Sequence, residues 1–198
     1  KTYNGVAIAS RHKIENVTEH LPGGADDAQA RYLEADINGV RVATIYLPNG
    51  NPVDGEKYPY KLAWMERLRR HAMKLLESEK PVVLGGDYNV IPEAVDVYDP
   101  EAWENDALFR AETRAAFRKI LHTCYTESFR ALHPNETHAS TFWDYQAGAW
   151  QRDNGLRIDH FLLSPEAADR LIRCDIDRAP RGKDKASDYT LLDTLLKE

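Results

Sequence analysis

The sequence has few cysteines, no long apolar run and no strong excess of one charge. Its two cysteines, Cys124 and Cys174, lack any CxxC or Cys/His ligand spacing, which argues against a disulfide framework or zinc knuckle and predicts a reducing, cytoplasmic location. No stretch approaches the roughly eighteen apolar residues of a membrane helix, and nothing resembles a signal peptide, so no membrane partner is expected. The net charge of −6 argues against a dedicated nucleic-acid coat, although it allows an enzyme with a local basic rim.

What the chain does contain is typical of a globular domain. Of its 198 residues, 42% are hydrophobic and 29% are charged, enough for a sizeable core under a solvated surface. No repeat, low-complexity tract or linker interrupts it. We therefore expect one domain over residues 1–198.

Short apolar runs separated by turn residues predict strands, and two longer periodic segments predict helices. Asn38-Gly39 favours a tight hairpin turn between two of the strands. The helices are expected at 57–79 and 106–122, where apolar residues recur at three- and four-residue steps. The predicted strands cover 5–10, 31–37, 41–47, 81–86, 140–145, 157–164 and 187–192. This mixture indicates an α/β layered sandwich with its loops gathered at one rim.

Polar side chains stand at the ends of four of these strands. Taken singly, each has a structural explanation: Asp87 and Asn89 as a turn or cap, Asp159 as an ion-pair partner of Arg157, and Tyr46 as a packed aromatic. Together, several carboxylates, carboxamides and a phenol would make a poor structural cluster, because like charges repel. They would make a good site for a divalent cation and a phosphate. The polar residues are Tyr46 and Asn49, Asp87 and Asn89, Arg157, Asp159 and His160, and Ser187, Asp188 and Tyr189.

The motifs "YLPNG", "GGDYNVIP", "TFWDY…GLRIDH" and "KASDYT", in this order, resemble those of the exonuclease III family of DNA repair nucleases. The resemblance runs through nearly the whole chain. It implies a four-layered α/β sandwich of two packed mixed β-sheets flanked by helices. It also implies Mg²⁺-dependent hydrolysis of double-stranded DNA at abasic sites and 3′ ends, as in base excision repair.

The resemblance implies a role for each matching residue. Asp87 would activate the attacking water, and Asn89 would orient that water or hold the phosphate. Tyr46 would bond to the scissile phosphate, Asp159 would assist the leaving group, and Asp188 would orient the residue after it. The metal would be Mg²⁺, with Mn²⁺ as the alternative, bound by Asp188, Asp87 and Asn89.

DNA contacts are expected beside this site. The resemblance places Trp143 where the family probes the duplex next to an abasic sugar, although a core tryptophan is an equal alternative. The basic loop "RAPRGKDKAS" (178–187) lies just before the last motif, so its cations are candidates for the DNA backbone. The predicted DNA-binding residues are Trp143, Arg157, Arg181, Lys183 and Lys185.

Two departures from the family pattern qualify these expectations. The family has Ser-Asp-His where this chain has Ser187-Asp188-Tyr189, and a phenol brings no positive charge to the phosphate. Two further family motifs, including a metal-binding glutamate, would precede Lys1, so N-terminal strands of one sheet are expected to be missing, which would encourage association. The chain is then a fragment, receives strands from another chain, or is a degenerate copy. Two further functions follow: a relative that binds DNA without cleaving it, and a phosphatase of small molecules or lipid headgroups.

Overall fold

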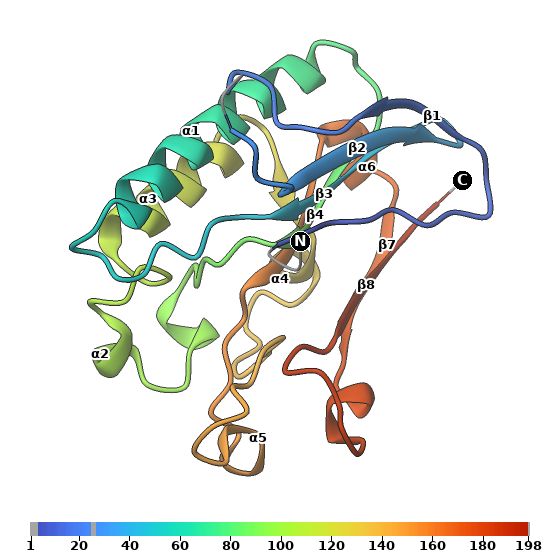
Figure 1. The fold of residues 1–198 in the computed structure, drawn as a ribbon. Helices are drawn as coiled ribbons and strands as arrows, with labels where there is room; N and C mark the ends of the chain where they lie inside the picture. Colours follow the sequence, from blue (N-terminus) through green and yellow to red (C-terminus); the bar gives the residue numbers. More distant parts are fainter. Residues whose placement is uncertain (1–3, 25–26, 198) are drawn as a thin grey trace.

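The computed structural model describes residues 4–24 and 27–197 and shows helices packed on a six-stranded sheet (Figure 1). The strand order of this sheet is β1-β2-β3-β4-β6-β5, and β7 and β8 form a second sheet. The strands are β1 (Ile14–Thr18), β2 (Tyr32–Ile37), β3 (Val40–Tyr46), β4 (Val82–Asp87), β5 (Thr126–Glu127), β6 (Asp159–Leu163), β7 (Leu171–Asp177) and β8 (Leu191–Leu196). The helices are α1 (Lys57–Leu76), α2 (Pro100–Trp103), α3 (Ala111–Leu121), α4 (Ser128–Leu132), α5 (Ala149–Arg152) and α6 (Pro165–Ala168), with 3₁₀ turns η1 (Ala94–Asp96) and η2 (Ala179–Gly182).

The centre of the large sheet is mixed. β2 and β3 form the predicted hairpin, and Asn38 and Gly39 both have positive φ, as its tight turn requires. Helix α1 then carries the chain over to β4, which pairs parallel to β3, and β6 pairs antiparallel to the other side of β4. As a result, the carboxyl-terminal ends of β3 and β4 lie side by side, next to the start of β6.

Helices cover one face of this sheet, and the small sheet covers the other (Figure 1). On the helical side, Trp64 and Leu68 of α1 and Phe117 of α3 bury their side chains against the strands. On the other side, residues of β7 and β8 pack on Val83 and Leu163. These contacts make the sheet a buried central layer.

The predicted α/β class with two packed sheets is confirmed. The second sheet has only two strands in the described part of the chain. Its outward side chains are exposed, 56% for Ile172 and 59% for Leu191, so a fourth layer does not cover it within the described residues. No helix in the described ranges is both long and apolar enough to cross a bilayer.

Two of the predicted strands are wrong, and β1, β5 and β7 were not predicted. Residues 5–10 alternate in burial but pair with no strand in the described ranges, because alternation alone does not provide a neighbour. Residues 140–145 make only isolated bridges from Phe142 to Leu156 and Tyr189. The last strand begins at Leu191, later than predicted. The two long helices are confirmed, although α3 begins only at Ala111.

Candidate active site

Three strands bring three of the predicted polar residues to one place. Tyr46 pairs with Asp87 across the parallel β3–β4 ladder, and Asp87 pairs with Asp159 across the antiparallel β4–β6 ladder. Directly paired residues in a sheet point to the same face, with β-carbons about 5 Å apart. The Tyr46 phenol and the carboxylates of Asp87 and Asp159 therefore lie on the same face of the sheet, at one end of its strands.

This end of the sheet opens into a cavity of about 410 Å³. Tyr189 reaches it from the segment before β8, so four predicted catalytic residues meet there. The lining residues are Gly5, Val6, Thr44, Ile45, Tyr46, Gly86, Asp87, Asp159, Tyr189 and Thr190.

Asp87 is held by two amide groups of Asn89. The Asn89 main-chain amide donates to Asp87 Oδ1 at 2.8 Å and the Asn89 side-chain amide to Oδ2 at 3.2 Å. Asn89 has φ +48°, a left-handed conformation that asparagine tolerates, and its side chain also donates to the Leu47 carbonyl. The Asp-x-Asn spacing is therefore a turn whose two side chains also build the site.

The surroundings of Asp87 and Asp159 favour the protonated form of these carboxyl groups. Burial raises the pKa of Asp87, against the opposing hydrogen bonds from Tyr189 and Asn89. Burial and then the nearby Asp87 charge raise the pKa of Asp159 well above its usual value. Asp159 Oδ2 is buried without a hydrogen-bond partner. Such a pair can divide the roles of proton acceptor and proton donor between its members.

Tyr189 bonds to Asp87 in this structure. Its hydroxyl donates to Asp87 Oδ2 at 2.8 Å, and its ring packs edge-on against Phe142. Burial, the Asp87 charge and this bond raise the pKa of Tyr189 far above its usual value, so the phenol stays protonated. It is a neutral donor in the place of an imidazole.

Comparison with known proteins agrees with this geometry. The profile of the Endonuclease/Exonuclease/phosphatase family matches residues 1–188. The chain belongs to this family. An exodeoxyribonuclease of Bacillus subtilis is 32% identical over 184 residues, which cover 93% of this chain and 72% of that protein. The exonuclease III branch is therefore the one to which the chain belongs.

Solved structures of the family match the fold closely. An AP endonuclease from Archaeoglobus fulgidus superposes with a TM-score of 0.88 at 36% identity, over 93% of this chain and 72% of that one. A 3′ phosphatase from Neisseria bound to a product DNA hairpin superposes with a TM-score of 0.92 at 33% identity, over 96% and 73% of the two chains. The family is one of DNA repair nucleases that depend on divalent metals.

The cavity offers the type of ligand that a divalent cation prefers, but too few of them. Carboxylate oxygens are the ligands that hard cations prefer, and Asp159 Oδ2 is a buried oxygen with no other partner. However, no group of three acidic, histidine or cysteine side chains arranged to hold a metal occurs within residues 4–24 and 27–197. The predicted set of Asp87, Asn89 and Asp188 does not gather in the cavity, since Asn89 lies behind Asp87 and Asp188 does not line it.

Asp188 does not orient Tyr189 through a hydrogen bond. Its carboxylate accepts a bond from the Ser187 hydroxyl at 3.3 Å, and its carbonyl accepts one from the Trp143 main-chain amide. The Tyr189 hydroxyl bonds to Asp87 instead. The arrangement expected from a histidine does not carry over, because the single polar atom of the phenol is already bonded to Asp87.

Two predicted DNA contacts are wrong because the side chains are inside the protein. Trp143 has no exposed surface, and its indole nitrogen donates to Asp153 at 3.1 Å. Arg157 is 2% exposed and forms ion pairs with Asp96 at 2.8 Å and Glu127 at 3.1 Å. Trp143 is the core tryptophan that the sequence offered as the alternative, and Arg157 stabilises the core.

The other basic residues differ among themselves. Arg181 is 8% exposed, donates to the Trp143 carbonyl and stacks over Tyr145, so most of its donors face the protein. Lys183 and Lys185 are exposed beside the last motif. These two lysines remain predicted DNA contacts.

Sequence reasoning missed Lys61. This lysine of α1 is fully buried, and its ammonium donates to the carbonyl oxygens of Asn49 and Asn89. A signal was present in the sequence, because Lys61 stands three and seven residues before the core residues Trp64 and Leu68. A lysine on the apolar stripe of a helix is unusual enough to suggest a specific partner.

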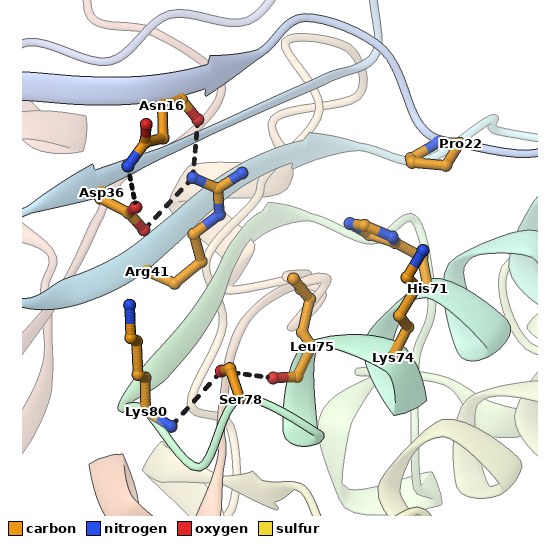
Figure 2. Close-up of a pocket in the computed structure, with 9 residues that line it drawn as sticks. All are labelled: Asn16, Pro22, Asp36, Arg41, His71, Lys74, Leu75, Ser78 and Lys80. Atoms are coloured by element: carbon orange, nitrogen blue, oxygen red, sulfur yellow. Dashed lines mark hydrogen bonds and ion pairs between the residues drawn. The ribbon is translucent and has the colours of Figure 1, made fainter.

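A second cavity, of about 400 Å³, lies at the opposite end of the sheet (Figure 2). Arg41 reaches from β3 to Asp36 and Glu34, at 3.2 and 2.7 Å. Arg41 pairs with Val82 at the start of β4, whereas Asp87 ends that strand, so the two cavities are separated by the length of the sheet. The ion pairs of Arg41 therefore tie β2 to β3 at this end of the sheet. Its lining residues are Asn16, Pro22, Asp36, Arg41, His71, Lys74, Leu75, Ser78 and Lys80.

Proposed function

We propose that this chain is a DNA phosphodiesterase of the exonuclease III type that acts at abasic sites and 3′ ends with Mg²⁺, or Mn²⁺ in its place. The observation that carries the proposal is the meeting of Tyr46, Asp87, Asp159 and Tyr189 in one cavity. The relatives named as AP endonuclease and 3′ phosphatase support abasic sites and 3′ ends as substrates.

Each side chain has a role that its surroundings support. Asp87, fixed by Asn89, accepts a proton from the water that attacks phosphorus. Asp159, whose burial favours its protonated form, gives a proton to the departing oxygen. Tyr46 donates its hydroxyl to a phosphate oxygen. A divalent cation, when bound, would supply positive charge against the phosphate, and Asp87 is the one predicted ligand that lines the cavity.

A second function is favoured by the bond between Tyr189 and Asp87. That bond occupies one oxygen of the carboxylate that is proposed to accept the proton, as would be expected of a relative that binds DNA without cutting it. An exposed Trp143 would have favoured duplex DNA over a small phosphorylated substrate. Because Trp143 is buried, it gives no argument against the phosphatase alternative.

The test is cleavage of a duplex that contains a tetrahydrofuran abasic analogue. We expect strand scission with Mg²⁺ and none with EDTA. Absence of scission, together with DNA binding by fluorescence anisotropy, would establish the second function. The variant Tyr189→His then tests the phenol as the cause: restored scission assigns the loss to the phenol, whereas continued inactivity shows that the phenol alone is not responsible.

A further inference from the structure

Lys61 is a buried cation directly behind the catalytic loops. Its side chain has no exposed surface, although lysine is almost never fully buried without a charged partner. Its Nζ is 3.0 Å from the Asn49 carbonyl oxygen and 2.6 Å from the Asn89 carbonyl oxygen. The attraction of Asp87 and Asp106 acts over a longer distance and does not offset the burial, which lowers the pKa of Lys61 to about 7. A group that is costly to bury needs a compensating role.

The two carbonyl groups belong to two different loops. Asn49 follows β3, and Asn89 follows β4. The side chains of these residues also meet, since the Asn49 amide donates to Asn89 Oδ1 at 3.1 Å. Asn89 in turn holds both oxygens of Asp87. One ammonium group therefore joins the two loops whose contact sets the position of the catalytic carboxylate.

The loop after β3 fits closely over the lysine. Gly50 has φ +95°, and a β-carbon added there would lie 2.7 Å from Lys61 Cδ and 3.1 Å from Ala107 Cβ. A larger residue at position 50 would push the loop away from the ammonium. The sequence thus combines a buried lysine with the glycine that lets a main chain approach it.

We infer that Lys61 is a positioning residue that fixes Asn89, and through it Asp87, by clamping the main chains of the loops after β3 and β4. The inference rests on the proposed function for its catalytic consequence, but the clamp itself does not. Removing the donor would let the two loops separate. A displacement of about 1 Å at a reacting group can cost on the order of 10²-fold in rate.

The test compares Lys61→Met, Lys61→Arg and Lys74→Met in the full chain. Lys74 lies on the same helix, is exposed and is remote from the site, so its variant is the matched control. The first measurement is amide hydrogen exchange, which needs no activity. We expect faster exchange in residues 47–51 and 88–91 of Lys61→Met, unchanged exchange in β2 and β3, and no change in Lys74→Met.

The second measurement is steady-state cleavage of the abasic duplex. We expect Lys61→Met to lower kcat about 10- to 100-fold with little change in KM, consistent with a misplaced Asp87 rather than weaker binding. Lys61→Arg keeps a donor and should recover part of kcat. Lys61→Met relieves the cost of burying an ammonium group but leaves two carbonyl oxygens without their donor, so the melting temperature should change little.

Unchanged exchange in both loops of Lys61→Met would overturn the inference. So would an increase in exchange throughout the sheet with a lower melting temperature, which indicates a general core role. If the parent chain cleaves no DNA, the proposed function fails while the exchange measurement still decides the role of Lys61.

Discussion

Buried acids at the two ends of one sheet behave in opposite ways. Glu34 bonds to Arg41 and His71, which Figure 2 shows at one end of the sheet. It is 2% exposed, and burial alone would keep it protonated, yet bonds from His71, Tyr32 and Arg41 lower its pKa to about 2. At the other end, burial raises the pKa of Asp87 and Asp159, because no cation lies within bonding distance of them in the described chain. The comparison shows that burial sets the cost of a charge, while its partners decide whether the charge persists. Glu34 has compensating partners, and the two acids of the proposed active site do not.

The largest effect that would test this comparison is on activity. We expect Asp87→Asn to lower cleavage of the abasic duplex by about 10²- to 10⁴-fold, the usual contribution of a general base. The melting temperature should not fall, because a buried acid without a cation is replaced by a neutral amide. The exposed Asp169→Asn serves as the control. A melting temperature reduced as much as that of a core variant would show that Asp87 is structural.

The next effect is on stability, at the other end of the sheet. We expect Glu34→Gln to lower the free energy of unfolding by about 3 kcal/mol, because it leaves Arg41 without its shortest ion pair. Cleavage per folded molecule should not change. Urea unfolding measures the first quantity, and initial rates corrected for folded fraction measure the second. Glu66→Gln breaks exposed pairs with Arg69 and Arg70 and should cost only about 0–1 kcal/mol.

The pH dependence of unfolding sharpens the same contrast. The folded pKa of Glu34, about 2, lies below its ordinary value of 4.5, so its stabilisation is complete above pH 4.5 and is lost as the pH falls from there toward 2. In Glu34→Gln, the free energy of unfolding should therefore fall less steeply between pH 4.5 and 2. The raised pKa of Asp159 has the opposite sign: the folded state loses stability as the pH rises above 3.8, and Asp159→Asn should remove this loss. If the free energy of unfolding fell equally with pH below 4.5 in the parent and in Glu34→Gln, the lowered pKa of Glu34 would be refuted.

The smallest expected effect concerns binding. Lys183→Ala and Lys185→Ala should each reduce the slope of log binding constant against log salt by about one, provided that each lysine neutralises one phosphate. Anisotropy titrations of the duplex at several salt concentrations measure the slope. Lys119→Ala, on the exposed side of α3, should leave it unchanged.

Local patterns predicted a large part of this architecture. The Asn38-Gly39 hairpin, the helices α1 and α3, and the clustering of Tyr46, Asp87 and Asp159 all follow from turn chemistry, periodicity and strand ends. These features depend on neighbours in the sequence or on the alternation of strands.

What could not be predicted depends on partners distant in the sequence. Whether Trp143 faces DNA or Asp153, and whether Arg157 meets Asp96, is decided by the folding of distant loops. The partners of Lys61 could not be predicted for the same reason, since they are main-chain carbonyl oxygens, which every residue carries. A side chain's type indicates what it can bond to, but not which backbone it will find.

The antiparallel register of β4 and β6 also bears on the order of events during synthesis. Asp87 and Asp159 become neighbours only when a strand near the carboxyl-terminal end of the chain docks beside one made much earlier. Contacts of such long sequence separation form late, because closing a long loop is entropically costly. During synthesis, the proposed active site is therefore not assembled until β6 has been made and has paired with β4.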